Sequence, residues 1–92
     1  MIKTFKHKGL ENFFRTGNSK GIQAKHKTKL QEQLSTLNEA ISLSDLSRPS
    51  YYLHQLQGVR KETWSIRVSG NWRLTFRFEN GNVHILNYED YH

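Results

Sequence analysis

The most informative absence in this 92-residue sequence is cysteine, which does not occur at all. Without cysteine the chain has neither disulfides nor cysteine-ligated zinc, and this suits a reducing compartment. No stretch approaches the roughly 20 apolar residues of a membrane-spanning helix. The opening MIKTFKHKGL lacks the apolar run of a signal peptide. We therefore expect a cytoplasmic protein with no membrane partner.

Acidic residues are scarce: 8 Asp and Glu stand against 14 Lys and Arg, which gives a formal charge of +6. Such a surface favours polyanions, with nucleic acid first and acidic membranes or acidic proteins next. The length predicts one domain over residues 1–92, and a chain this short buries only roughly 60–65% of its unfolded surface. Any site is therefore expected on an open face or in a shallow cleft.

The first half of the chain has helical periodicity. A short strand is expected in MIKTFKHK, and Leu10, Phe13 and Phe14 then share one helical face that Gly17 would end. From about residue 23 to 41 a second apolar stripe recurs at helical spacing, made of Leu30, Leu34, Leu37 and Ile41.

The second half is aromatic and β-branched. YYLHQL, WSIRV, NWRLTFRF and NVHILNY are predicted strands. Asn80 and Gly81 both tolerate positive φ, so they favour a type I′ hairpin between the last two strands. We expect an α+β domain in which two N-terminal helices cover one face of a mostly antiparallel sheet of four or five strands. The other face would be open to solvent.

Strand alternation predicts a row of arginines on that open face. The apolar side chains of WSIRV and NWRLTFRF point one way, and Arg67, Arg73 and Arg77 point the other. Within those strands no acidic residue alternates among them. An ordinary solvated face is the simpler interpretation, but the planar guanidinium also suits bidentate contact with phosphate.

Motifs for metal or nucleotide chemistry are missing. There is no HExxH, no pair of histidines at i and i+4, no carboxylate cluster, no glycine-rich phosphate loop and no nucleophile elbow. We expect no metal and no cofactor. Histidine, tyrosine, aspartate and arginine are enough to cleave RNA, whose 2′-hydroxyl is the nucleophile, with a base, an acid and a cation to help. DNA lacks that hydroxyl and would not be cut this way.

The segments YYLHQLQG, WSIRV and NWRLTFRFENGNVHILNYEDYH together resemble the HigB-type toxins, a branch of the RelE superfamily of toxin–antitoxin ribonucleases. The resemblance covers the whole chain and is most specific in the WSI and NWRLTF segments and the terminal YEDYH. It implies the RelE-like α+β fold and messenger RNA as substrate, cut in the decoding site of the 70S ribosome to inhibit translation. It also implies a HigA-like helix-turn-helix antitoxin, and operator DNA indirectly through that antitoxin.

By position, the resemblance implies a catalytic group of His54, Arg73, Asp90, Tyr91 and His92. Arg73 would stabilise the phosphorane, and the two histidines would be acid and base in an order that stays unassigned. Tyr91 would stack on a base or relay a proton, and Asp90 would orient a histidine or contact RNA. The C-terminal tail is then expected to lie pinned beside the sheet.

The RNA-binding residues expected around this group are Gln57, Arg60, Lys61, Arg67 and Arg77. Close HigB relatives carry a lysine where this chain has Gln57, so Arg60 and Lys61 are the candidates to supply that charge. Two other interpretations stay open. A non-catalytic module that binds RNA or the ribosome would show the same cations and aromatics, since stacking and charge suffice for binding. A basic face that only docks an acidic protein is the third.

Overall fold

The computed structural model describes residues 1–91, and His92 lies outside the described residues. Two helices, α1 (Lys8–Thr16) and α2 (Lys27–Glu39), precede a four-stranded antiparallel sheet of order β1-β2-β3-β4. The strands are β1 (His54–Gln55), β2 (Trp64–Ser69), β3 (Trp72–Glu79) and β4 (Asn82–Asp90). Short 3₁₀ turns fill the connections: η1 (Ala24–His26), η2 (Leu43–Leu46), η3 (Pro49–Tyr51) and η4 (Gly58–Arg60). The predicted α+β class is confirmed.

The first helix begins and ends as the sequence indicates. Nδ1 of His7 accepts the backbone N–H of Leu10 at 2.9 Å, which caps the N-terminus of α1. Gly17 ends the helix in the left-handed region at φ 81°. No helix among the described residues is long and apolar enough to cross a membrane.

The second helix is shorter than the predicted range of 23–41. The turn η1 precedes it, and the chain becomes extended at Ala40. Ile41 therefore does not continue the apolar stripe: its side chain is 81% exposed, and Ala40 is buried.

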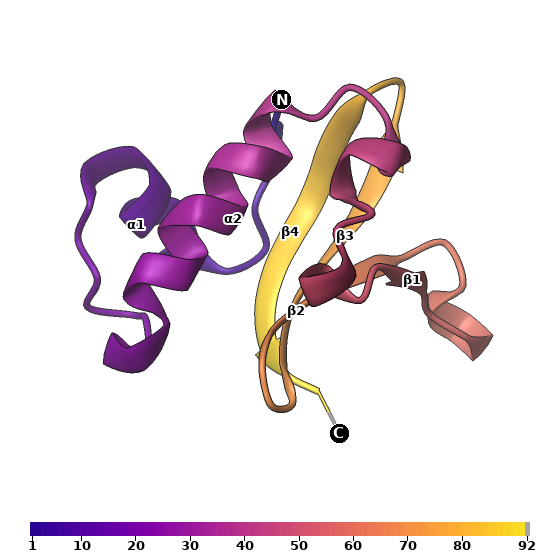
Figure 1. The fold of residues 1–92 in the computed structure, drawn as a ribbon. Coiled ribbons are helices and arrows are strands. Elements are labelled where there is room, and N and C mark those ends of the chain that lie inside the picture. The colour runs from indigo at the N-terminus through magenta and orange to yellow at the C-terminus, as the bar shows by residue number, and fades with distance from the viewer. Residues whose placement is uncertain (92) are drawn as a thin grey trace.

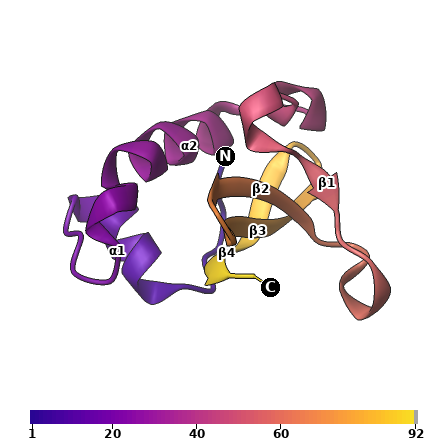
Figure 2. The same ribbon diagram turned by 60° about the horizontal axis from the view of Figure 1, so that its bottom comes forward.

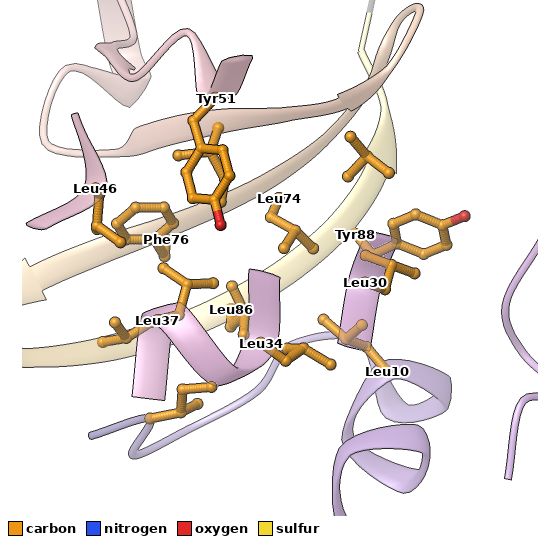
Figure 3. Packing of buried hydrophobic residues seen from close by; sticks show 14 of the residues in the cluster. Leu10, Leu30, Leu34, Leu37, Leu46, Tyr51, Leu74, Phe76, Leu86 and Tyr88 are labelled. Carbon is orange, nitrogen blue, oxygen red and sulfur yellow. The ribbon is translucent and has the colours of Figure 1, made fainter. Parts of the chain in front are cut away.

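The core lies between the helices and one face of the sheet. Both helices lie on the same side of the sheet in Figures 1 and 2, and Figure 3 shows their leucines facing the strands. The buried cluster includes Leu10, Leu30, Leu34, Leu37, Leu74, Phe76 and Leu86. This packing leaves the opposite face of the sheet for a site.

The predicted strand over YYLHQL is reduced to β1. Pro49 starts η3, a position that suits its fixed φ, and Tyr52 then adopts φ 48°. Tyr51 is buried, and its hydroxyl donates to Glu32 of α2 at 2.8 Å. This anchor uses the residues that the strand would need, so only His54 and Gln55 pair with β2.

The N-terminal segment and β4 also depart from regular pairing. MIKTFKHK makes isolated parallel bridges, Ile2 to Val83 and Phe5 to Leu86, in place of a full strand. The predicted turn at residues 80–81 is confirmed, with φ 52° and 75°. Beyond it the β3–β4 register shifts by one residue between Thr75 and Arg77, a β-bulge at which Ile85 takes φ 55°.

Candidate active site on the open sheet face

The sheet face opposite the helices carries two rows of polar side chains that run across the strands. The first row follows the register from β1 to β4 and consists of His54, Ser65, Thr75 and Asn87. The second row lies two residues further along and consists of Arg67, Arg73 and Glu89. Neighbouring strands are spaced about 4.8 Å apart, so the Cα atoms of His54 and Arg73 lie roughly 12 Å apart. Their long side chains rise from the same face, so a substrate lying on it can meet both.

Tyr91 lies against two guanidinium groups of this face. The Cζ atom of Arg73 is 5.9 Å from the ring centroid, and that of Arg60 is 5.8 Å away. The backbone N–H of Tyr91 donates to the carbonyl of Asn71 at 2.8 Å, which extends the β3–β4 pairing past the end of β4. The tail is thus held as far as Tyr91, beside the β2–β3 turn (Figure 1). His92 is beyond the described residues.

Arg73 has unused donors. Its Nε and Nη1 atoms are buried and have no hydrogen-bond partner within the described part of the chain. Burying an unsatisfied donor costs about 1–3 kcal/mol, so such a group calls for an explanation. In a guanidinium the Nε–H lies on the same edge as Nη2, so Nε and Nη1 are two separate donors, each of which can donate to one oxygen of an anion.

Glu89 is a site residue that the sequence reasoning missed. Its carboxylate accepts from Arg60 Nη1 at 3.1 Å and Nη2 at 2.8 Å, from Thr75 Oγ1 at 2.6 Å and from Asn87 Nδ2 at 3.2 Å. The hydrogen bond from Arg60 is the main cause that lowers the pKa of Glu89, and the same bond raises the pKa of Arg60. Arg60, expected to bind RNA, is therefore held by a carboxylate.

His54 is exposed and has one ring nitrogen placed against the backbone. Its Nδ1 lies 3.2 Å from the carbonyl oxygen of Tyr52 and 3.5 Å from Oγ of Ser65. A carbonyl can only accept, so the contact to Tyr52 requires a tautomer with a proton on Nδ1, which leaves Nε2 available to another partner. This tautomer suits proton transfer at Nε2.

Asp90 and Arg67 lie at the margins of the group. Asp90 pairs in register with Trp72, so alternation places it on the face opposite to Arg73. The Cζ of Arg67 lies 5.4 Å from the ring of Tyr52, which is 59% exposed. Of the expected catalytic residues, the structure brings His54, Arg73 and Tyr91 to one face.

The remaining expected RNA-binding residues are spread out. Arg77 lies further along β3, and its Nη2 contacts Glu62 at 3.2 Å and Glu79 at 3.4 Å. Gln57 and Lys61 are exposed at either side of η4, and the carbonyl of Lys61 accepts a hydrogen bond from the Gln55 side chain. Among residues 1–91, no three histidine or acidic side chains gather as a metal site.

A family model described as the RelE-like toxin of the type II toxin–antitoxin system HigB matches residues 3–92. The chain belongs to the HigB-like toxin family. A curated relative, the protein named Endoribonuclease HigB from Proteus vulgaris, is 47% identical over 92 residues, which cover the whole of both chains. The resemblance to HigB toxins is thereby confirmed over the full length.

Solved structures agree on the fold of this HigB-family toxin. The YoeB–YefM complex from Staphylococcus aureus contains a chain that matches with a TM-score of 0.63. The match covers 100% of this chain and 95% of that chain at 18% sequence identity. At this identity the likeness shows the fold alone, and it confirms the RelE-like arrangement of helices and sheet.

Proposed function

We propose that this HigB-family toxin is an endoribonuclease that cleaves messenger RNA in the decoding site of the 70S ribosome and so inhibits translation. The observation that carries the proposal is that two buried donors of Arg73, Nε and Nη1, have no hydrogen-bond partner among residues 1–91, on the sheet face that Arg73 shares with Tyr91 and His54. The full-length relative named an endoribonuclease supports the same reaction class.

In the proposed reaction the RNA strand lies on the open face, and its own 2′-hydroxyl attacks the adjacent phosphorus. The 2′-O–P bond forms and the P–O5′ bond breaks, which leaves a 2′,3′-cyclic phosphate and a 5′-hydroxyl. Nε and Nη1 of Arg73 would donate to the nonbridging oxygens as their charge grows. A preorganised donor of this kind is worth about 10²–10³ in rate.

Two proton transfers accompany this displacement. Nε2 of His54 would take the 2′-hydroxyl proton or supply one to the 5′-oxygen. For the complementary transfer the candidates are the hydroxyl of Tyr91 and the side chain of His92, which lies outside the described residues. Asp90 would orient a histidine or contact the RNA.

The proposed contacts to the RNA backbone are Gln57, Lys61, Arg67 and Arg77. Arg60 would join them once it is released from Glu89. An open face such as this one cannot by itself align a flexible strand. Alignment of reacting groups is worth about 7–11 kcal/mol in favourable cases, and the ribosome, which already holds the message, would supply part of it. We propose a HigA-like helix-turn-helix antitoxin as the partner that restrains the toxin and links it to operator DNA.

The test is cleavage of a ribosome-programmed messenger RNA, mapped by primer extension, with free messenger RNA alongside. We expect wild type to cut only in the presence of ribosomes, and Arg73→Ala and His54→Ala to lose the cuts. Arg15→Ala is the matched control, because Arg15 is an exposed arginine of α1 on the helix side. Cleavage by Arg73→Ala at the wild-type rate would contradict the proposal.

The second candidate is a non-catalytic module that binds RNA or the ribosome. Tyr52 and Tyr91 favour it, since both are exposed and each lies against an arginine, as in a stacking platform for bases. Ribosome binding without any cut in wild type would establish this function. Lost rate with retained affinity in the variants favours the enzyme.

A further inference from the structure

A cavity of about 130 Å³ opens on the polar face at the Arg77 end of the sheet. Its wall includes the cationic side chains Lys6, Arg60 and Arg77 and the polar side chains Thr63 and Asn87. We propose that this cavity binds a backbone phosphate of the RNA strand other than the phosphate that is cleaved. The inference rests on the proposed function, because that function makes RNA the ligand.

The cavity has donors without acceptors. Nε of Arg77 is buried and has no hydrogen-bond partner among the described residues, while its Nη2 pairs with Glu62 and Glu79. Within residues 1–91 the Lys6 ammonium and the Thr63 hydroxyl also have no hydrogen-bond partner. An ammonium and a hydroxyl at one hollow, with the Arg60 and Arg77 side chains in its wall, are what phosphate oxygens need.

A residue with a strained backbone, Ile85, forms part of the wall of this cavity. Ile85 in its wall has φ 55°, a conformation that β-branched residues rarely adopt, and its side chain is 47% exposed, so the core does not explain it. Its N–H donates to Oγ1 of Thr4 at 2.8 Å, and the N–H of Lys6 donates to the carbonyl of Leu86 at 2.8 Å. The bulge thus ties the N-terminal segment to β4 and sets Lys6 at the hollow.

The cavity and the Arg73 guanidinium are two separate places for phosphate. Glu89 pairs with Arg73 in register and holds Arg60, Thr75 and Asn87, which all line the cavity. A carboxylate at this boundary repels a phosphate that would span it. Among residues 1–91, Lys6 is the cation of the hollow with no carboxylate partner, because Glu89 pairs with Arg60 and Glu62 and Glu79 pair with Arg77. A strand on this face would therefore use Arg73 for one phosphate and the cavity for another.

The first test measures binding of a single-stranded RNA made uncleavable by 2′-O-methylation, as a function of salt. One phosphate contact to a single strand changes the slope of log Kd against log salt by about 0.7, so Lys6→Ala should lower the slope by that amount. Lys3→Ala is the matched control, since it removes the same charge from the same segment without lining the cavity. Equal slopes for the two variants would overturn the proposal.

The second test identifies which phosphate of the RNA binds in the cavity. Methylphosphonate links that neutralise one phosphate at a time, in a message that programmed ribosomes hold in register, should reveal a position where wild type and Lys3→Ala lose affinity but Lys6→Ala does not. In parallel, inorganic phosphate is titrated while the Nε–H resonance of Arg77 is followed by NMR. A saturable shift that Lys6→Ala weakens supports the site. A shift with inorganic phosphate but no sensitive position in the RNA would overturn the assignment to RNA.

These outcomes separate the inference from the function on which it rests. Cleavage of programmed messenger RNA by wild type, together with equal salt slopes for Lys6→Ala and Lys3→Ala, would refute the phosphate cavity alone. A wild type that never cleaves but shows the Lys6-dependent slope would refute the nuclease and keep the cavity.

Discussion

The two faces of the sheet both contain fully buried residues, but they are closed in different ways. On one face, Leu74 and Phe76 are 0% exposed beneath the helices (Figure 3). On the other, Ser65 and Thr75 are 0% and 2% exposed, and there Thr75 is bonded to the ion pair of Arg60 and Glu89. The helix-covered face is fixed by packing, whereas the polar face is held by charges that a ligand can compete for. Because successive residues of a strand point to opposite faces, residues that stabilise the core alternate with residues that a ligand can reach.

The largest effect should come from Phe76→Ala on the covered face. Truncating a buried phenylalanine costs about 3–5 kcal/mol in the free energy of unfolding, because it leaves a cavity among rigid neighbours. Urea unfolding followed by circular dichroism measures it. Phe78→Ala, two residues along β3 and only partly buried, is the matched control and should cost clearly less. Equal losses of unfolding free energy in the two variants would contradict the statement that packing under the helices dominates stability.

Arg73→Leu should have the opposite effect: a large loss of cleavage with little change in stability. Cleavage of programmed messenger RNA should slow by about 10²–10³, the value of one preorganised donor. The free energy of unfolding should stay level or rise, since the change removes two buried N–H donors that have no hydrogen-bond partner among residues 1–91. Arg73→Lys keeps the positive charge but lacks the planar guanidinium, so it should restore little activity. A stability loss as large as that of Phe76→Ala, with cleavage intact, would place Arg73 in the core instead.

Glu89→Gln tests the charges that hold the polar face. We expect a loss of about 1–2 kcal/mol at pH 7, within the range for hydrogen bonds to charged groups. Because folding lowers the pKa of Glu89, its contribution is present above the unfolded value of about 4.3 and is lost as pH falls through the folded pKa. The variant should therefore match wild type more closely at pH 3 than at pH 7. A difference that does not change with pH would mean that the ion pair contributes nothing.

Much of the covered face could be predicted from sequence, because helical spacing and strand alternation report burial directly. Alternation also predicted the arginines of the polar face, but it could not predict which residues β4 contributes there, because the register of β4 depends on the bulge. An unbroken ladder from the turn at Asn80 would pair Arg73 with Tyr88, and Glu89 and Tyr91 would then point to the helix side. The bulge at Ile85 moves both to the face of Arg73. Isoleucine gives no signal for positive φ, so only the family resemblance indicated Tyr91, and nothing indicated Glu89.

A smaller, pH-dependent effect is expected on the covered face. His26 is 2% exposed, its Nδ1 lies 2.6 Å from the Tyr88 hydroxyl, and burial lowers its pKa. Burial also lowers the pKa of His7. The stability that these neutral rings support is present above the unfolded pKa of about 6.5 and is lost as pH falls through the folded values. Unfolding measured from pH 7 to 5 should show a shallower decline in His26→Gln than in wild type. Parallel curves would show that His26 does not titrate on folding.

The smallest effect is expected where the two faces are joined, at Ile85. Asparagine tolerates the left-handed region better than isoleucine does, so Ile85→Asn should stay within about 1 kcal/mol of wild type in urea unfolding. Val83→Asn, two residues earlier in β4 and fully buried, should cost about 3 kcal/mol or more. If the bulge sets the register, Ile85→Asn also keeps Tyr91 beside Arg73, and cleavage should persist. Loss of cleavage with stability unchanged would mean that the isoleucine side chain itself contacts the RNA, and the polar face would then extend beyond its charged groups.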